Sequence, residues 1–144
     1  MTPAPTTPDA MVRALSAVPT FLVPDVAATA RWYVEQLGFD LAGQFPGQVP
    51  YAYASLQRGG AEIMLLSLAG YEKPDLAPLR PAGLWDAYIR TDGVGAFYTA
   101  LGATPFIVAP LTQRPYGNWE FEVRDPNGYR LVFGGDLNAG ASRS

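Results

Sequence analysis

The sequence predicts an α+β fold in which a unit of one strand, one helix and three strands occurs twice. The two helical segments match each other, since each follows an aspartate, Asp25 or Asp92, and each ends at a Leu-Gly pair. The segments around them occur in the same order, and a stretch rich in proline and glycine separates the halves. The predicted organisation is a flexible tail at 1–14, a first unit at 15–68, a linker at 69–83, a second unit at 84–135 and a flexible tail at 136–144.

The first unit begins with an apolar run that predicts a strand over residues 14–23, which Pro24 ends. Asp25 suits a helix N-cap, because its carboxylate can accept a hydrogen bond from a free backbone N–H of the first turn. The helix is predicted over 26–37, where apolar residues recur at helical spacing, and Gly38 suits its C-cap. Further strands are predicted at 39–45, 51–57 and 61–68, the last two as a hairpin around Arg58-Gly59-Gly60.

The second unit repeats this order after the linker, whose prolines leave room for at most one short helical turn. Residues 84–91 alternate between apolar and polar side chains and predict a strand. Asp92 is the predicted N-cap of a helix over 94–101, which Gly102 ends. A strand follows at 106–109, and a hairpin closes the unit.

The closing hairpin is organised by Asp125-Pro126-Asn127-Gly128, a sequence typical of a type I turn followed by a glycine bulge. This loop places Asp125 opposite Tyr129 and fixes the register of both strands. The predicted pairs are Arg124–Arg130, Val123–Leu131, Glu122–Val132 and Phe121–Phe133. One face then carries Phe121, Val123, Leu131 and Phe133, and the other carries Glu120, Glu122, Arg124, Arg130 and Val132. We expect the first face to pack on a core and the second to face water or a lined cavity.

The composition excludes several functional classes. The chain has 144 residues and a net charge of −3, with neither cysteine nor histidine. Without cysteine there are no disulfides, no thiolate metal sites and no cysteine nucleophile. Without histidine the commonest metal ligand and the commonest general base are missing, and a Ser-His-Asp triad is impossible. No basic stripe predicts a nucleic-acid partner.

No segment predicts export or a membrane partner. Residues 1–14 are rich in Thr, Pro and Ala and lack the apolar core of a signal peptide. No apolar run approaches the roughly 20 residues that a membrane helix needs. We therefore expect a cytoplasmic protein.

Two stretches resemble a known superfamily. Val23-Pro24-Asp25-Val26 with Trp32-Tyr33-Val34-Glu35-Gln36-Leu37-Gly38-Phe39 is similar to its opening motif, and the run from Pro115 to Gly128 is similar to its closing "P-W-G-x-x-F-x-x-x-D-P-x-G" motif. The chain thus resembles, over residues 15–135, the vicinal oxygen chelate superfamily of glyoxalase I, extradiol dioxygenases, fosfomycin resistance enzymes and bleomycin resistance proteins. This resemblance implies the glyoxalase/bleomycin resistance fold, two curved mixed sheets around a cleft, and a homodimer.

The resemblance also says where a metal would bind. Enzymes of this superfamily chelate a divalent metal with His and Glu on their first, fourth, fifth and eighth strands. These positions fall on Val18, Leu65, Asp86 and Val132. Because three of the four are aliphatic, and one carboxylate cannot hold a metal alone, we expect neither a metal nor another cofactor. The chain is then closest to the bleomycin-resistance branch, whose members sequester a toxic molecule without catalysis.

Strand alternation selects the candidate ligand-binding residues. If Asp86 faces the cleft, so do Tyr88 and Arg90, whereas Trp85, Ala87 and Ile89 face the helices. Tyr116 stands at the family position of a Trp that stacks on ligand in antibiotic-binding members. The predicted ligand-binding residues are Tyr51, Tyr53, Asp86, Tyr88, Arg90, Tyr116, Trp119, Glu120 and Glu122. They predict a small aromatic ligand that can carry a positive charge.

Other interpretations stay open. Tyr51 and Tyr53 can be ordinary sheet residues, and Glu120, Glu122 and Arg124 can form a solvated face with cross-strand ion pairs. A buried Asp86 can be neutralised by Arg90 or Arg130. An alternative function is a metal-independent enzyme of lyase or isomerase type with Asp86, Glu122 or Tyr88 as acid or base. An interaction module with a vestigial cleft comes next, and a metal-dependent lyase or dioxygenase comes last.

Overall fold

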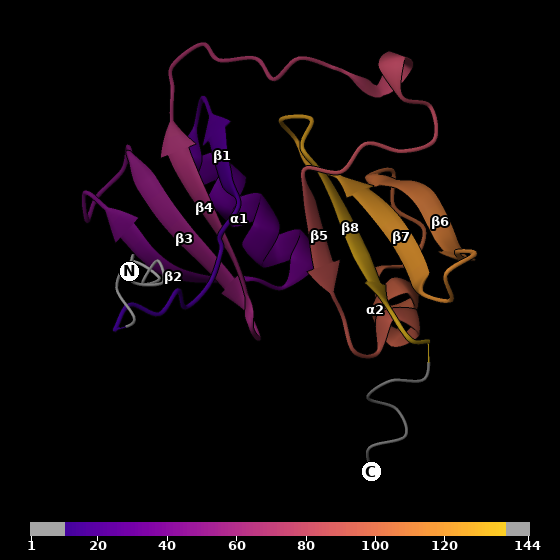
Figure 1. Ribbon diagram of the computed structural model, residues 1–144. Coiled ribbons are helices and arrows are strands. Elements are labelled where there is room, and N and C mark those ends of the chain that lie inside the picture. The colour runs from indigo at the N-terminus through magenta and orange to yellow at the C-terminus, as the bar shows by residue number, and fades with distance from the viewer. Residues whose placement is uncertain (1–10, 138–144) are drawn as a thin grey trace, which may run out of the picture.

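The computed structural model describes residues 11–137, and it confirms the α+β fold with a duplicated unit (Figure 1). The first unit contains β1 (Thr20–Val23), α1 (Val26–Leu37), β2 (Asp40–Phe45), β3 (Tyr53–Arg58) and β4 (Ala61–Ser67). The linker holds one 3₁₀ turn, η1 (Ala77–Leu79). The second unit contains β5 (Ala87–Arg90), α2 (Val94–Leu101), β6 (Ile107–Gln113), β7 (Trp119–Arg124) and β8 (Arg130–Gly135). Neither helix of the described region is long and apolar enough to cross a membrane.

Each unit forms a four-stranded mixed sheet with one parallel pair. The strand orders are β1-β4-β3-β2 and β5-β8-β7-β6, so the first strand of each unit pairs with the last. The two helices begin at Val26 and Val94, 68 residues apart. Met64 and Val132 are also 68 residues apart, and each pairs with the first strand of its own sheet. The duplication therefore extends to the register of the strands.

Helix α1 has the predicted limits and caps. The Asp25 carboxylate accepts a 3.0 Å hydrogen bond from the Ala28 N–H, and Gly38 ends the helix in the left-handed conformation with φ of 72°. Val26, Ala30, Tyr33 and Leu37 are buried on its inner face. Residues at this spacing share one side of a helix, so α1 covers the first sheet with an apolar stripe.

Helix α2 differs from its prediction at the N-terminus. Its N-cap is Gly93, in the left-handed conformation with φ of 71°, and no side chain caps the first turn. The prediction that Asp92 is the N-cap is wrong, because the chain enters the helix one residue later through a conformation that glycine adopts readily. The helix ends at Gly102 as predicted and is one turn shorter than α1.

Three strands differ by several residues in length from their predictions. The predicted strands at 14–23 and 84–91 shorten to Thr20–Val23 and Ala87–Arg90. Residues 12–19 have no regular structure, and the parallel pairing with β4 begins only after Pro19, which cannot donate a backbone hydrogen bond. The predicted strand at 106–109 extends to Gln113, since register shifts on both sides of Ala109 accommodate Pro110. Of the predicted tails, 1–10 and 138–144 lie outside the described residues.

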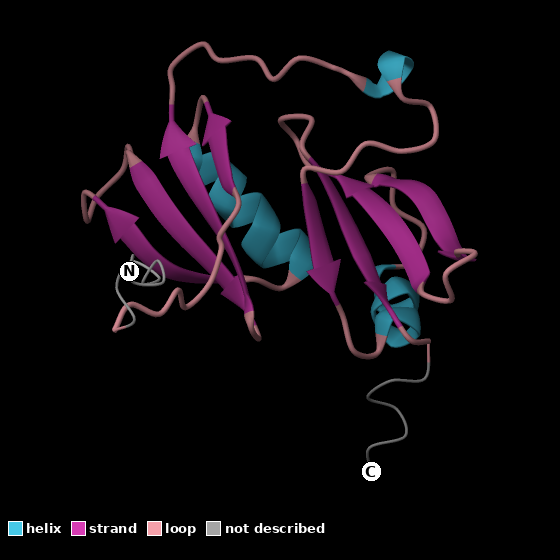
Figure 2. Ribbon diagram, in the orientation of Figure 1, coloured by secondary structure: helices cyan, strands magenta, loops and turns pink. Residues whose placement is uncertain are grey.

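A single apolar core joins both units. Trp32 of α1 packs edge-on against Phe106 at a ring distance of 5.2 Å, and Phe21 stacks on Tyr129 at 4.1 Å. The Arg58 guanidinium lies over the Phe97 ring at 4.9 Å. Helix α1 thus lies between the two sheets in Figure 2, in contact with the first sheet and with the loops of the second.

The closing turn fastens the units by hydrogen bonds. The Tyr33 hydroxyl donates to Asp125 at 2.7 Å, and the Asn127 amide donates to the Thr29 hydroxyl at 2.9 Å. The Tyr129 hydroxyl donates to the Leu22 carbonyl at 2.7 Å. Burial raises the pKa of Asp125 above its usual value, and it raises the pKa of Tyr33 well above its usual value.

The register predicted for the closing hairpin is confirmed. Asp125 faces Tyr129, and all four predicted pairs from Arg124–Arg130 to Phe121–Phe133 are present. The face with Phe121 and Phe133 packs against α2. On the opposite face Glu120 and Glu122 are only 3% and 7% exposed. The interpretation of these two glutamates as a solvated face is therefore wrong.

Candidate functional site

A cluster of polar side chains on the helix-free face of the second sheet is centred on Glu120. Oε2 of its carboxylate accepts hydrogen bonds from the Tyr88 hydroxyl at 2.7 Å and from the Tyr116 hydroxyl at 2.6 Å. Oε1 accepts from Nε of Arg114 at 3.1 Å, and the Asn118 amide donates to the Tyr88 hydroxyl at 3.1 Å. We call these five residues the Glu120 cluster.

The turn between β6 and β7 positions three members of the cluster. The Arg114 N–H donates to the Asn118 carbonyl, and the Gly117 N–H donates back to the Arg114 carbonyl. Gly117 has a φ of 104°, which a residue with a side chain rarely adopts. This tight turn brings Arg114, Tyr116 and Asn118 to the same end of β7. The Pro-Tyr-Gly-Asn part of the closing motif thus builds the site as well as the fold.

Gly134 of β8 leaves room for Tyr88. A β-carbon at this position would overlap the Tyr88 hydroxyl oxygen and lie 2.9 Å from Cγ of Glu120. The tyrosine side chain can therefore reach across β8 to Glu120 only because position 134 has no side chain. Burial raises the pKa of the Tyr88 phenol, and its hydrogen bond to Glu120 raises it further.

Two more carboxylates lie on this face, and both are neutralised within the chain. Glu122 pairs with Arg130 at 3.0 Å, and Asp86 pairs with Lys73 of the linker at 3.4 Å. Asp86 also accepts a 2.8 Å hydrogen bond from the backbone N–H of Arg130. The expectation that an arginine side chain neutralises Asp86 is wrong, because the Arg130 guanidinium is directed to Glu122 and the linker supplies a lysine.

Exposed aromatic rings border the cluster. Trp85 is 41% exposed, with its ring 5.4 Å from that of Tyr88, and Tyr116 is 62% exposed. The prediction that Trp85 faces the helices is wrong, because β5 begins at Ala87 and strand alternation does not extend back to residue 85. For Ala87 and Ile89 the same prediction is confirmed, since both pack against the core.

The other predicted residues lie further from the cluster. Arg90 is exposed, with its guanidinium 5.9 Å from the Tyr88 ring. Trp119 alternates to the core face of β7 and lines a small pocket together with Tyr116 and Asn118. Tyr51 packs against the core of the first unit.

The last predicted tyrosine, Tyr53, pairs with Leu66 in the first sheet. Among the described residues, no contact joins Tyr51 or Tyr53 to the cluster within one chain. Their role in ligand binding stays a prediction, as does that of the other seven.

Sequence reasoning missed Lys73, Trp85, Arg114 and Asn118. Arg114 and Asn118 flank the recognised Pro-Tyr-Gly turn, and a closed turn brings its flanking residues together, so this signal was available. Lys73 lies in the irregular linker, where no periodicity indicates the direction of a side chain. Its partner therefore could not be inferred from the sequence.

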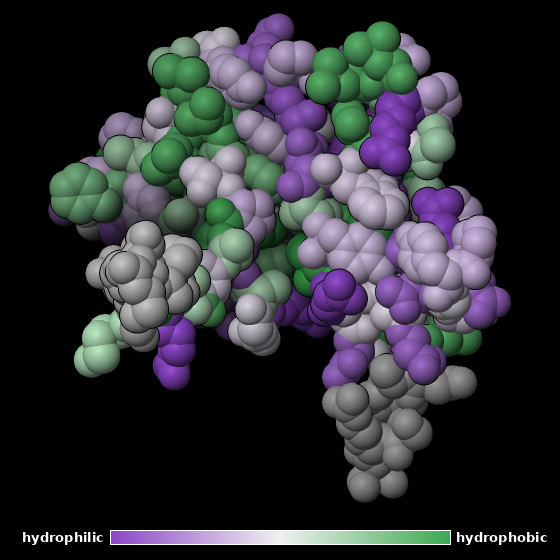
Figure 3. All heavy atoms as spheres, viewed as in Figure 1, coloured by the Kyte–Doolittle hydropathy of each residue, from purple (hydrophilic) through white to green (hydrophobic). Residues whose placement is uncertain are grey.

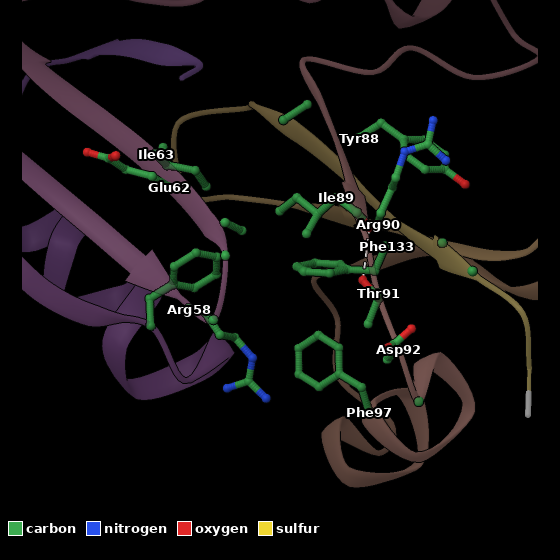
Figure 4. Close-up of a pocket in the computed structure, with 18 of the residues that line it drawn as sticks. Arg58, Glu62, Ile63, Tyr88, Ile89, Arg90, Thr91, Asp92, Phe97 and Phe133 are labelled. Atoms are coloured by element: carbon green, nitrogen blue, oxygen red, sulfur yellow. Dashed lines mark hydrogen bonds between the residues drawn. The ribbon is translucent and has the colours of Figure 1, made fainter. Parts of the chain in front are cut away.

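A groove of about 1260 Å³ separates the two units at the open edge of β5 (Figure 4). Ile89, Phe97 and Phe133 point into it from the second unit, and Arg58 and Ile63 border it from the first. Tyr88 and Arg90 also line the groove, although their side chains lie on the other side of β5 from Ile89 in this view. Its lining mixes apolar side chains with charged ones, and the groove borders the Glu120 cluster, because Tyr88, Asn118 and Gly134 belong to the lining.

The four chelate positions carry no set of metal ligands. Asp86 is paired as described, and Val132 is a buried aliphatic residue. The assignment of Leu65 needs correction: Leu65 is fully buried in the core, and the register that matches Val132 of β8 is that of Met64 in β4. Among residues 11–137, no three Asp or Glu side chains lie close enough together to hold a metal ion.

Comparisons with known proteins agree with this architecture. The profile of the Glyoxalase/Bleomycin resistance protein/Dioxygenase superfamily matches residues 16–133. A search of curated proteins finds no match.

Several solved structures share the fold. TioX from Micromonospora sp. ML1 is 24% identical, with a TM-score of 0.63 over 84% of this chain and 98% of TioX. The bleomycin-binding protein from bleomycin-producing Streptomyces verticillus, complexed with copper(II)-bleomycin, is also 24% identical, with a TM-score of 0.62 over 85% and 97% of the two chains. TnmS3, an antibiotic binding protein from Streptomyces sp. CB03234, is 26% identical, with a TM-score of 0.53 over 85% and 97%.

Proposed function

This chain belongs to the Glyoxalase/Bleomycin resistance protein/Dioxygenase superfamily, and we propose that it sequesters a small aromatic molecule without metal and without catalysis. In this proposal it is a cytoplasmic homodimer whose ligand binds against the Glu120 cluster. Similar folds belong to a bleomycin-binding protein and an antibiotic binding protein, and this similarity supports a binding role.

The chelate positions carry the proposal. Val18, Met64 and Val132 offer no oxygen or nitrogen ligand, and Asp86 already has a lysine partner and a backbone N–H. The chain contains no histidine that could enter the site from elsewhere. Three protein ligands are usual in a catalytic metal centre, so metal-assisted chemistry at this place finds no support in the side chains.

The Glu120 cluster has the properties of a preorganised binding surface. Its central carboxylate is buried, and three donors fix its position. Trp85 and Tyr116 remain exposed, so their rings can stack on a planar ligand. Such aromatic pairs are worth about 0.5–1.5 kcal/mol each beyond the area that they bury. Fixed polar groups beside flat apolar surfaces are typical of small-molecule sites.

The homodimer is proposed because the two units expose surfaces of different polarity. Polar side chains gather over the second unit, and apolar ones gather over the upper part of the first (Figure 3). The apolar residues include Leu22, Leu66, Leu68 and Phe45, which are between 36% and 68% exposed. Pairing the first unit of one chain with the second unit of another would remove this surface from water and bring Tyr53 opposite the Glu120 cluster.

Titration of Trp fluorescence tests sequestration. Purified protein treated with EDTA is titrated with bleomycin and with neutral planar aromatic compounds, and binding of at least one compound at micromolar concentration or below is expected. Trp85→Phe is the matched variant, since it should bind with a smaller fluorescence change while keeping the tryptophans at 32 and 119. Stoichiometric metal that survives EDTA treatment, found by elemental analysis, would refute the metal-free proposal.

A metal-independent enzyme of lyase or isomerase type is the second candidate. The observation that favours it is the chain of hydrogen bonds from Asn118 through Tyr88 to Glu120, in which the raised pKa of Tyr88 keeps a proton available. Asp86 and Glu122 are the other predicted acid–base groups. Turnover of a bound compound that is lost in Asp86→Asn or Tyr88→Phe would favour this candidate over sequestration.

A further inference from the structure

We propose that the ligand is a planar aromatic molecule without positive charge that presents carbonyl or anionic oxygen acceptors. This inference rests on the proposed binding function and specifies the ligand class. It replaces the cationic ligand that the acidic residues of the sequence predict. The reasons are the state of the carboxylates on the helix-free face and the donors that remain there.

The three carboxylates of this face each have a cationic partner within the chain. Glu120 has Arg114 and two tyrosine hydroxyls, Glu122 has Arg130, and Asp86 has Lys73. Their side chains are 1%, 9% and 23% exposed. A cationic ligand would have to compete with a protein cation at each of these carboxylates, because each already has an ion-pair partner.

Other acidic residues near the site are engaged too. Asp92 and Asp136, which follow the C-terminal ends of β5 and β8, each have an interaction partner. Glu62, on the helix-free face of the first sheet, accepts a hydrogen bond from the Ser55 hydroxyl at 2.8 Å. These carboxylates therefore already use part of their hydrogen-bonding capacity within the chain.

Donors, in contrast, remain accessible. Arg114 binds Glu120 through Nε alone, and its side chain is 36% exposed, so the outer edge of its guanidinium can donate to a ligand. Arg90 is exposed at the end of β5, with its guanidinium beside the Tyr88 ring. These arginines lie near Tyr88 and Tyr116, whose rings offer flat surfaces. Together they suit an aromatic system that carries oxygen acceptors.

Three anthraquinones of one shape and different charge test the inference: the 2-sulfonate, the neutral 2-hydroxymethyl compound and a 2-trimethylammoniomethyl compound. Dissociation constants are measured by calorimetry and by Trp fluorescence at 50 and 300 mM salt. We expect the anionic and neutral compounds to bind at least tenfold more tightly than the cation. Salt should weaken the anion more than the neutral compound.

Two arginine variants connect the preference to the site. Arg114→Gln and Arg90→Gln should each weaken the anion at least threefold and leave the neutral compound within about twofold. Arg31→Gln, an exposed position of α1, is the matched control and should change neither. Because Arg114 also supports Glu120, its variant is compared with the wild type by thermal unfolding, and Arg90→Gln, which breaks no ion pair of the cluster, provides the independent result.

The outcomes separate the two proposals. Tightest binding of the cation, or equal binding of all three compounds, overturns the ligand class and leaves sequestration standing. Loss of anion binding in Arg31→Gln alone places the site elsewhere and overturns the inference. Failure of all three compounds to bind at high micromolar concentration counts against sequestration of planar aromatics and removes the basis of the inference.

Discussion

The substitution Tyr33→Phe tests how the two units are held together. It removes the hydroxyl that donates to Asp125 at 2.7 Å and changes little else. Both residues are buried, at 0% and 3% exposure, so water cannot replace the lost donor without opening the core. A hydrogen bond to a charged group contributes about 1.5–3 kcal/mol, and a buried acceptor left without its donor adds to the cost. We therefore expect Tyr33→Phe to lower the free energy of unfolding by about 2 kcal/mol at pH 7.

The effect should depend on pH in a defined direction. The pKa of Asp125 is raised in the folded state, mainly by burial, although the Tyr33 hydrogen bond opposes the rise. The contribution of the Asp125 carboxyl group to stability is therefore complete below its unfolded pKa of about 3.9, and it is lost as the pH rises through its folded pKa. Tyr33→Phe raises the folded pKa further, so the variant loses more stability on ionisation. The difference from wild type should be larger at pH 7 than at pH 4.

Urea unfolding followed by circular dichroism measures this difference. With an m-value of about 2 kcal/mol/M, the midpoint should fall by about 1 M at pH 7. Tyr98→Phe is the control, because it also removes a hydroxyl from an aromatic side chain packed on the core. A loss below about 0.5 kcal/mol at pH 7, or an equal loss at pH 4, would refute the assignment of a stabilising bond to an ionised Asp125.

Three further predictions concern the site and its assembly. Gly134→Ala should destabilise the protein by about 1–3 kcal/mol and weaken ligand binding, because the new methyl group overlaps the Tyr88 hydroxyl. Thermal unfolding and fluorescence titration measure the two effects, and an unchanged melting temperature would contradict the geometry of the cluster. Tyr88→Phe should cost about 1–2 kcal/mol through loss of its bond to Glu120, whereas Tyr53→Phe should cost less than about 0.5 kcal/mol by the same unfolding assay. Leu66→Lys should shift the proposed homodimer to a monomer in analytical ultracentrifugation. Leu79→Lys is the control and should leave the dimer intact, because Leu79 lies in the linker and is 82% exposed. A Leu66→Lys variant that stays dimeric would place the interface elsewhere.

Local turn chemistry explains why much of the fold could be predicted from the sequence. The Asp125–Gly128 loop fixes a register, and the register determines that Phe121 faces the core and Glu120 the other side. Asp25 and Gly38 fix the two ends of α1 at the predicted residues, because a capping residue acts within one turn of the helix end. These features depend on neighbours a few residues away, and such neighbours can be read directly from the chain.

The site was predicted less completely, because its contacts join distant segments. Glu120 meets Tyr88 across 32 positions of the sequence, and Asp86 meets a linker lysine whose direction no periodic pattern indicates. Sequence alternation places Trp85 on the wrong face, because β5 begins only at Ala87. Ion pairs also change what a carboxylate can bind, since one that appears available for a ligand in the sequence can already have a partner in the fold.

The two halves of this protein differ at the position of Gly134. Its counterpart in the first half, 68 residues earlier, is Leu66, and the counterpart of Tyr88 is Thr20. A tyrosine at position 20 would meet the leucine side chain, and the residue paired with Leu66 is Tyr53, whereas Gly134 is paired with Glu120. The first half could therefore acquire a similar polar cluster only by changing all three positions together. Two backbones of the same register thus support different surfaces, and no single substitution gives the first half the cluster of the second.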